Sequence, residues 1–85
     1  MRASETKEFN KPFSFVVDQI KQDPFAKFAR AGWGANMYIW YGQMHVDGEK
    51  NLIDTLCMRS RDGSVVVGWQ PWSPDMLADD WGQVQ

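Results

Sequence analysis

Residues 59–81 read RSRDGSVVVGWQPWSPDMLADDW, and this stretch decides how the rest of the chain is organised. Asp62-Gly63 stands between two runs of alternating apolar and polar residues, which indicates a β-hairpin with a two-residue type I′ turn. Counting outward from this turn predicts the cross-strand pairs Arg61–Ser64, Ser60–Val65, Arg59–Val66, Met58–Val67 and Leu56–Trp69.

This register gives the hairpin two different faces, because side chains alternate along a strand. The face that we expect in the core carries Leu56, Met58, Val65, Val67 and Trp69. The other face, expected toward solvent or an anionic group, carries Cys57, Arg59, Arg61, Val66 and Gly68.

A short helix is predicted after the hairpin. Pro71 cannot donate a hydrogen bond to a neighbouring strand, so strand pairing should end near Gln70. Ser73 is then the expected N-cap, Pro74 the first helical residue, and Asp75 an acid at the positive end of the helix dipole.

An amphipathic helix is predicted near the N-terminus. Its apolar side chains recur with helical spacing at Phe13, Val16, Val17 and Ile20. We expect Asn10 or Lys11 as the N-cap, with Pro12 in the first turn, and Asp23-Pro24 at the end because a residue before proline avoids the α region.

The middle of the chain reads mainly as strands. Residues 25–30 fit a helical turn or a short strand, and the strand is favoured. Residues 37–41 predict a strand with Met37, Ile39 and Tyr41 on one face and Tyr38 and Trp40 on the other. Residues 42–51, with Asp47-Gly48, indicate a loop or small hairpin, and residues 52–60 lead into the central hairpin. The predicted class is α+β: an N-terminal amphipathic helix packed on a small antiparallel sheet, with a short C-terminal helix.

Composition limits the class of protein. The 85 residues suit one domain, 1–85, with loose tails expected at 1–10 and 82–85. A formal net charge of −2 supplies no basic field for nucleic acid. One cysteine excludes an internal disulfide, and no apolar run approaches the about 18 residues of a membrane span. We therefore expect a cytoplasmic protein without a nucleic-acid or membrane partner.

Catalytic and metal sites are poorly supported by the sequence. His45 lies in a polar loop, and Cys57 lies within a strand, where a small packing residue is expected rather than a nucleophile. Asp79 and Asp80 are adjacent on a short helix, so their side chains diverge and no third ligand is spaced to join them. We expect no catalytic residue, no metal and no cofactor.

Binding is better supported. Five Trp, five Phe and two Tyr are many for a small core, which suggests a ligand pocket or a subunit interface. Aromatic faces near the guanidinium groups of Arg30, Arg59 and Arg61 suit a base with phosphates. Trp33, between two glycines, fits a ligand contact and a core position about equally well from the residues alone.

The motifs together resemble a known family. From residue 13 to residue 81 the chain is similar to the second Thoeris anti-defence family of small phage proteins. The matching pieces are the helix pattern at 13–21, ARAGW at 29–33, GANMY at 34–38, MRSRDGSVVV at 58–67, WQP at 69–71 and DMLADDW at 75–81. One departure is Gly68, where the family usually has a proline before the hairpin tryptophan.

This resemblance implies a non-enzymatic sponge for a cyclic nucleotide immune signal. The signal would be a cyclic ADP-ribose isomer such as glycocyclic ADP-ribose, and some members are similar to sponges for cyclic oligonucleotides as well. The resemblance also implies a homotetramer, a dimer of dimers with pockets at subunit interfaces, in the cytoplasm of the infected bacterial host. Trp33 would stack on the ligand, and Arg59 is our candidate phosphate contact. The expected ligand-binding set is Trp33, Gly34, Asn36, Met37, Tyr38, Arg59, Trp69 and Trp72.

Three other functions compete with the sponge. A hydrolase of the same signal would need a base with an orienting partner, and the sequence offers none. A protein-binding module could inhibit a host defence enzyme directly through its aromatic surface, and this is the main alternative. Single-stranded nucleic-acid binding would need a basic groove, which the acidic balance disfavours.

Overall fold

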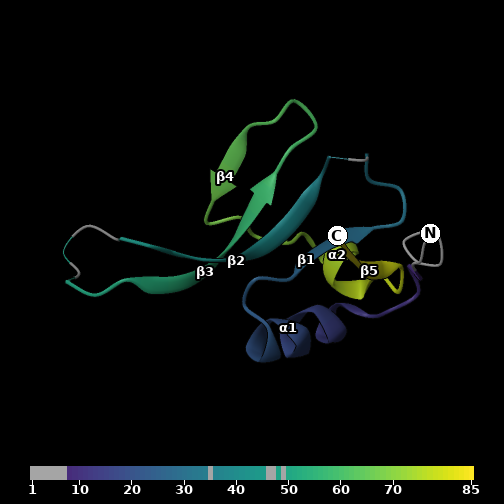
Figure 1. Cartoon of the computed structure of the whole chain (residues 1–85), viewed down its shortest axis with the longest axis horizontal. Helices are drawn as coiled ribbons and strands as arrows, with labels where there is room; N and C mark the ends of the chain where they lie inside the picture. Colours follow the sequence, from purple (N-terminus) through teal and green to yellow (C-terminus); the bar gives the residue numbers. More distant parts are fainter. Residues whose placement is uncertain (1–7, 35, 46–47, 49) are drawn as a thin grey trace.

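The computed structural model describes residues 8–34, 36–45, 48 and 50–85. One antiparallel sheet carries the fold, with strand order β4-β3-β2-β1-β5 and one longer helix on a single face (Figure 1). In chain order the elements are α1 (Phe13–Gln22), β1 (Lys27–Arg30), β2 (Tyr38–Met44), β3 (Ile53–Arg59), β4 (Val65–Val67), α2 (Ser73–Leu77) and β5 (Trp81–Val84). The predicted α+β class is confirmed. Neither α1 nor α2 is long and apolar enough to cross a membrane.

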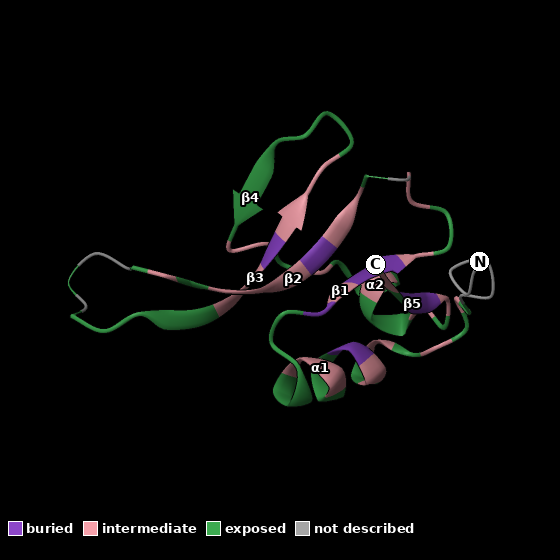
Figure 2. Cartoon of the chain, viewed as in Figure 1, coloured by how far each residue is buried: buried purple, intermediate pink, exposed green. Residues whose placement is uncertain are grey.

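The core lies between α1 and the sheet. Val16 on the inner face of α1 is fully buried, as are Phe28 of β1 and Ile39 of β2, which pair in register. Trp81 of β5 joins them and is also fully buried, and Ala26 completes the cluster. Figure 2 shows this buried set running across the middle strands and the inner side of α1. The helical spacing of the sequence therefore reports the core-facing side of α1 at Phe13, Val16 and Ile20, whereas the predicted Val17 is exposed and Phe15 packs against the core instead.

Helix α1 ends as predicted but begins later. Asp23 is its C-cap, one residue before the proline. The N-cap is Pro12 rather than Asn10 or Lys11. Lys11 instead forms a β-bridge with Trp81, with N–H to O distances of 2.9 Å in both directions. This bridge keeps the chain extended up to Pro12.

The central hairpin is formed, but its predicted register is wrong by one residue. Cys57 pairs with Val67, and Arg59 pairs with Val65. The loop has three residues, 61–63, because the Ser60 amide donates to the Ser64 carbonyl at 2.8 Å. Only Gly63 in this loop has a positive φ, +91°, whereas a type I′ turn needs a positive φ at both central residues.

The Asp62 side chain explains why the longer loop forms. Its Oδ1 atom accepts hydrogen bonds from the Ser64 amide at 2.9 Å and from the Ser60 and Ser64 hydroxyls at 2.7 Å each. These bonds lower the pKa of Asp62 from 3.8 to about 2, the hydroxyl of Ser64 contributing most. The carboxylate thus closes the three-residue loop with its own hydrogen bonds. These bonds compete with the two-residue turn, and the Asp-Gly pair in the sequence does not reveal them.

The shifted register changes which valines face the core. Val66 shares a face with Met58, while Val65 and Val67 lie on the opposite face with Cys57 and Arg59. All three valines are about half exposed. The predicted core positions of Val65 and Val67 are therefore wrong.

A bulge at Gly68 then restores the predicted neighbours. The amides of Gly68 and Trp69 both donate to the Leu56 carbonyl, at 3.0 and 2.9 Å. Gly68 adopts a φ of +87°, which a proline, fixed near −65°, cannot reach. Because two residues oppose one, Trp69 returns to a position beside Leu56 as the sequence predicted.

The bounds of β1, β2 and α2 can be compared with the predicted ones. The short strand within 25–30 is confirmed as β1. Strand β2 continues past residue 41 to Met44 and pairs with β3 along its whole length, so the two extend from the body as an arm (Figure 1). Asp47, in the predicted loop, lies outside the described residues. Trp72, not Ser73, is the N-cap of α2.

The expected loose tail at 82–85 is wrong, because residues up to Val84 form β5. This strand pairs antiparallel with β1, placing Trp81 opposite Arg30 and Gly82 opposite Ala29. Few β-branched residues mark it in the sequence, so its order comes from tertiary pairing rather than from local propensity.

Gly82 offers a test of this packing. A Cβ atom there would lie 2.4 Å from the Glu8 carbonyl oxygen and 2.8 Å from Phe9 Cδ1. Gly82→Ala should therefore lower the free energy of unfolding by roughly 1–3 kcal/mol. Thermal unfolding followed by circular dichroism should show a midpoint lower by about 4–8 °C for each kcal/mol.

The matched control is Gly32→Ala, because no atom lies within 4 Å of a Cβ at Gly32. Its effect should stay within about 0.5 kcal/mol. Equal midpoints for the two variants would contradict the position of residues 8–9 over β5.

Candidate functional site

Three tryptophans converge on one cavity beside α2. The cavity holds about 370 Å³, near the lower end of the range for ligand pockets. We call it the tryptophan pocket, and its lining residues are Trp33, Met37, Met58, Trp69, Trp72, Pro74 and Asp75. They come from the loop before β2, from β3, from the bulge after β4 and from α2, so four separate segments must fold before the pocket exists.

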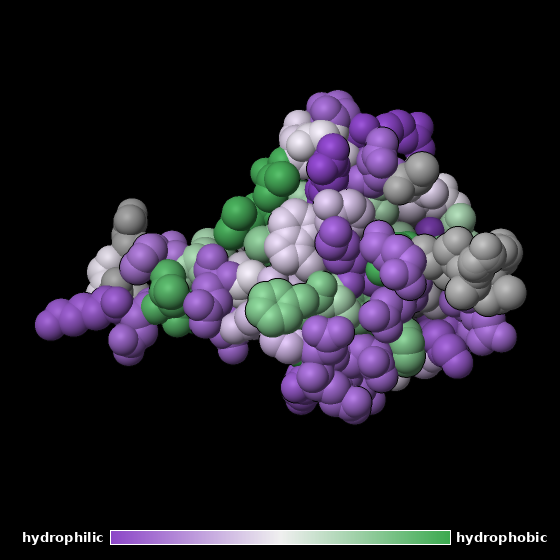
Figure 3. Space-filling model, in the orientation of Figure 1, coloured by the Kyte–Doolittle hydropathy of each residue, from purple (hydrophilic) through white to green (hydrophobic). Residues whose placement is uncertain are grey.

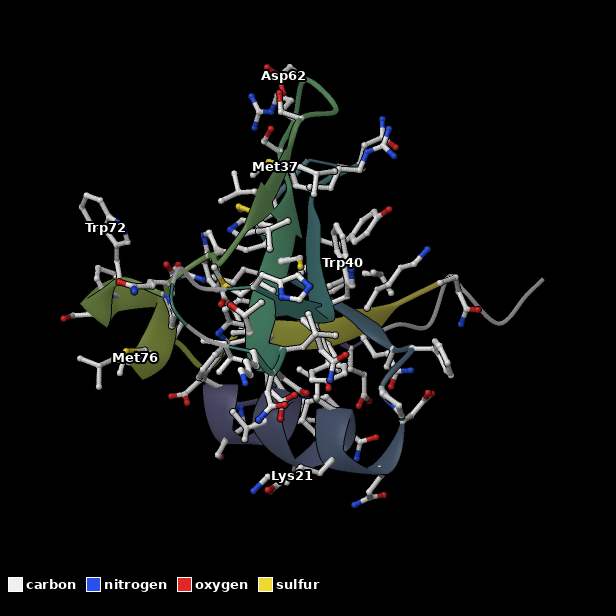
Figure 4. All side chains as sticks on the ribbon, turned by 90° about the vertical axis from the view of Figure 1, so that its left-hand side faces the viewer. Lys21, Met37, Trp40, Asp62, Trp72 and Met76 are labelled. Atoms are coloured by element: carbon white, nitrogen blue, oxygen red, sulfur yellow. The ribbon has the colours of Figure 1, made fainter. Side chains whose placement is uncertain are left out.

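Two of the three indoles are held against the rest of the protein. The Trp33 ring centroid lies 5.3 Å from that of Trp81 and 6.2 Å from that of Trp69, both in edge-to-face contact. Trp72 differs, because 77% of it is exposed and it stands out from α2 (Figure 4). The pocket therefore has a fixed floor and one free aromatic wall.

Half of the predicted ligand-binding set lines this pocket, namely Trp33, Met37, Trp69 and Trp72. Gly34 is next to it, and its carbonyl accepts the Met37 amide at 3.0 Å. Asn36 is exposed and does not line the cavity.

Tyr38 and Arg59 lie on the other face of the sheet. They pair directly across β2 and β3, in the positions that alternate with the core residues Ile39 and Met58. There Tyr38 contacts Trp40, with ring centroids 5.4 Å apart, and the Lys27 ammonium lies 4.9 Å from its ring. Within one subunit the sheet separates these two residues from the tryptophan pocket.

Asp75 and Arg30 tie α2 to the sheet. Arg30 Nη1 donates to Asp75 Oδ1 at 3.0 Å, and Arg30 Nε donates to Asp80 Oδ1 at 2.9 Å. The Asp80 hydrogen bond is the main cause that raises the pKa of Arg30. The second Asp75 oxygen accepts the Trp72 amide at 3.1 Å, as an acid near a helix N-terminus can. Arg30, one of the three arginines that could accompany an aromatic face in binding phosphate, instead forms structural ion pairs with Asp75 and Asp80.

Sequence reasoning did not assign Met58, Pro74 or Asp75 to the site. Met58 was placed on the core face with Trp69, and that shared face was the available signal. Pro74 and Asp75 were assigned only to the start of the helix. Their side of α2 faces the pocket because Arg30 of β1 and the indole of Trp81 hold Asp75 in place, and these long-range contacts cannot be read from local sequence.

Two wider cavities lie elsewhere. One, about 550 Å³, lies between α1 and the β2–β3 arm, and its polar contact is a 2.8 Å hydrogen bond from the Tyr41 hydroxyl to Asp54. That bond raises the pKa of Tyr41. The other, about 570 Å³, lies beside Tyr38 and Trp40 on the opposite face of the sheet. The first is lined by one aromatic ring, that of Tyr41, and the second by four, those of Phe25, Tyr38, Trp40 and Tyr41. We favour the tryptophan pocket as the ligand site because three indoles line it, among them that of Trp33, to which the family resemblance assigns stacking on the ligand.

The residues considered for catalysis or metal binding lie apart. His45 is exposed just past β2, and Cys57 is buried on the sheet beneath Gly42. In the part of the chain that the structure describes, no three His, Cys, Asp or Glu side chains gather to hold a metal ion.

Trp33 and Trp72 should differ in their effect on the free protein. Trp33→Ala removes the contact with Trp81 and should lower the free energy of unfolding by roughly 1–3 kcal/mol, below the range for a fully buried tryptophan. Trp72→Ala should change it by less than about 0.5 kcal/mol because the side chain is mostly exposed. Urea unfolding measures both changes. An equal decrease in the free energy of unfolding for the two variants would show that Trp33 does not pack against the core.

Comparison with known proteins adds the family. The family model for the Thoeris anti-defense 2-like (Tad2-like) domain matches residues 12–84, which is nearly the whole chain. Comparison with curated proteins gave no match. The matched range contains every element from α1 to β5 and all of the tryptophan pocket. The chain therefore belongs to the Thoeris anti-defense 2-like family.

Proposed function

We propose that this protein is an anti-defence sponge. It binds a cyclic nucleotide immune signal, such as a cyclic ADP-ribose isomer, in the tryptophan pocket and keeps it from its receptor without degrading it. The observation that carries this proposal is the convergence of Trp33, Trp69 and Trp72 on one cavity. The family supplies the anti-defence role, and the cytoplasm of the infected host cell is where such a signal would be met.

The pocket suits a base. A purine offers two flat faces and an edge, and stacking on an aromatic side chain contributes about 1–3 kcal/mol per base. Trp33 is already fixed by Trp69 and Trp81, so little side-chain entropy is lost when a ligand stacks on it. Trp72 is free to close on the other side.

The pocket is poorly equipped to cleave its ligand. Its one lining carboxylate, Asp75, already accepts hydrogen bonds from Arg30 and from the Trp72 amide. A general base must instead be free to take a proton from an attacking water. Binding without turnover is the expected behaviour.

Self-association belongs to the same proposal, with a homotetramer built as a dimer of dimers as the expected assembly. The sheet face opposite α1 carries Tyr38 and Trp40, and the edge strand β4 exposes its three valines. Figure 3 shows an apolar region at β4. An exposed apolar surface next to an open strand edge is typical of an interface.

The main alternative is a protein-binding module that inhibits a host defence enzyme. It is favoured by the apolar side chains that α2 presents to solvent, since Trp72 is 77% exposed and Leu77 is 80% exposed. Leu77 distinguishes the two functions, because Trp72 lines the pocket and could serve both, whereas Leu77 lies outside the pocket.

A thermal titration tests the proposal. The protein is heated with each member of a panel of cyclic ADP-ribose isomers and cyclic dinucleotides. One ligand should raise the free energy of unfolding by about 2.7 kcal/mol when present at a hundred times its Kd. Mass spectrometry of the ligand released from the heat-denatured protein should find it intact.

Two variants separate the alternatives. Trp72→Ala should weaken ligand binding by about 5- to 150-fold, given a stacking energy of about 1–3 kcal/mol, while Leu77→Ala should leave it unchanged. Release of a cleaved product would contradict the sponge. No shift with any ligand, together with a host protein captured by the wild type and lost in Leu77→Ala, would establish the alternative.

A further inference from the structure

We infer that Arg61 binds the phosphate groups of the nucleotide held in the tryptophan pocket. This inference rests on the proposed function and replaces Arg59, the phosphate contact suggested by the predicted register. The hairpin turn places Arg59 and Arg61 in different surroundings.

The turn brings Arg61 to the loop that carries Trp33. A Cβ atom on Gly34 would lie 3.3 Å from Arg61 Nε and 3.9 Å from both Arg61 Nη2 and Met37 Sδ. The guanidinium and the Met37 sulfur therefore lie within 4 Å of one point. Since Met37 lines the tryptophan pocket, Arg61 lies near one of the lining residues, beside the space that the missing side chain of Gly34 leaves open.

The three-residue loop is what directs Arg61 there. In the predicted two-residue turn Arg61 would pair with Ser64 as part of the strand, whereas in the structure it is the first residue of the loop. The loop backbone is fixed by the hydrogen bonds that Asp62 accepts from Ser60 and Ser64. Arg61 is thus presented by a rigid turn while its side chain stays exposed.

Within the described part of the chain, the charge of the Arg61 guanidinium is also unpaired. No carboxylate of the described residues lies within ion-pair distance of Arg61. Asp62 is the carboxylate nearest to Arg61 in sequence. Its Oδ1 atom already accepts the hydrogen bonds from Ser60 and Ser64 that close the turn. A guanidinium binds phosphate through paired, charge-assisted hydrogen bonds, which suits it to the pyrophosphate of a cyclic ADP-ribose.

The other cations near the sheet do not fit this role. Arg30 is paired with Asp75 and Asp80. Arg59 and Lys27 lie on the opposite face with Tyr38. Lys21 on α1 is at the far end of the molecule from Met37 and Asp62 (Figure 4).

The test compares Arg61→Gln with Arg59→Gln, two variants with the same change of charge on opposite faces of the hairpin. Isothermal titration measures their affinity for a cyclic ADP-ribose isomer and for adenosine, which lacks phosphate. Arg61→Gln should lower the affinity for the isomer by about 10- to 100-fold, the range that corresponds to the loss of a hydrogen bond to a charged group. Its affinity for adenosine should not change, and Arg59→Gln should bind both ligands like the wild type.

Each other result overturns the inference. Equal affinity of Arg61→Gln and wild type for the isomer would remove Arg61 from the site while the proposed function stands. A parallel loss of adenosine binding would show a structural role only. A larger decrease in affinity for the isomer in Arg59→Gln than in Arg61→Gln would show that the phosphate contact is Arg59, on the other face. Failure of the wild type to bind any member of the panel would remove the proposed function and this inference together.

Discussion

The fold depends on the burial of one side chain, Trp81. Its indole is fully buried, contacts Phe13 of α1 at a centroid distance of 5.2 Å, and donates from Nε1 to the Asp75 carbonyl at 2.8 Å. Its backbone forms the bridge to Lys11. One residue near the end of the chain thus joins the start of α1, the edge of the sheet and α2. A chain of 85 residues has few such anchors, because a small domain buries a limited share of its surface.

The candidate site is built outward from the same anchor. Trp33 leans on the Trp81 ring, and the Trp81 indole and Arg30 together fix Asp75, which in turn fixes the backbone at Trp72. The floor of the pocket is therefore continuous with the core, while its outer wall is exposed. A site of this kind is preorganised on one side and adaptable on the other, which suits capture of a rigid cyclic ligand.

Much of the fold could be predicted from the sequence, because the spacing of apolar residues and the residues that end helices or form turns are local signals. The spacing from Phe13 to Ile20 indicated α1, Asp23-Pro24 marked its end, and the alternation in 37–41 assigned the faces of β2 correctly. The hairpin was also predicted, and its register failed because hydrogen bonds to one carboxylate, Asp62, favoured a three-residue loop. Strand β5 was not predicted, because its extended structure depends on pairing with β1 and its own residues carry little strand signal.

The site was predictable in part for the same reason. The aromatic content and the glycines around Trp33 pointed to a pocket, and four members of the expected set line one cavity. Met37 and Tyr38 lie on opposite faces because side chains alternate along the strand, whereas a one-residue change in the hairpin turn separates Arg61 from Arg59. Asp75 joined the pocket through the path of the chain after Gly68, which only tertiary structure reveals.

The central claim is that the ligand stacks in the tryptophan pocket. The most direct measurement is the indole N–H region of a nitrogen-15 NMR spectrum, recorded while a cyclic ADP-ribose isomer is titrated into the protein. The chain has five tryptophans. The signals of Trp33, Trp69 and Trp72 should shift, while that of Trp40, on the opposite sheet face, should stay in place. A saturable shift of Trp40 with the three pocket signals unmoved would contradict the account and place the ligand on the other side of the sheet.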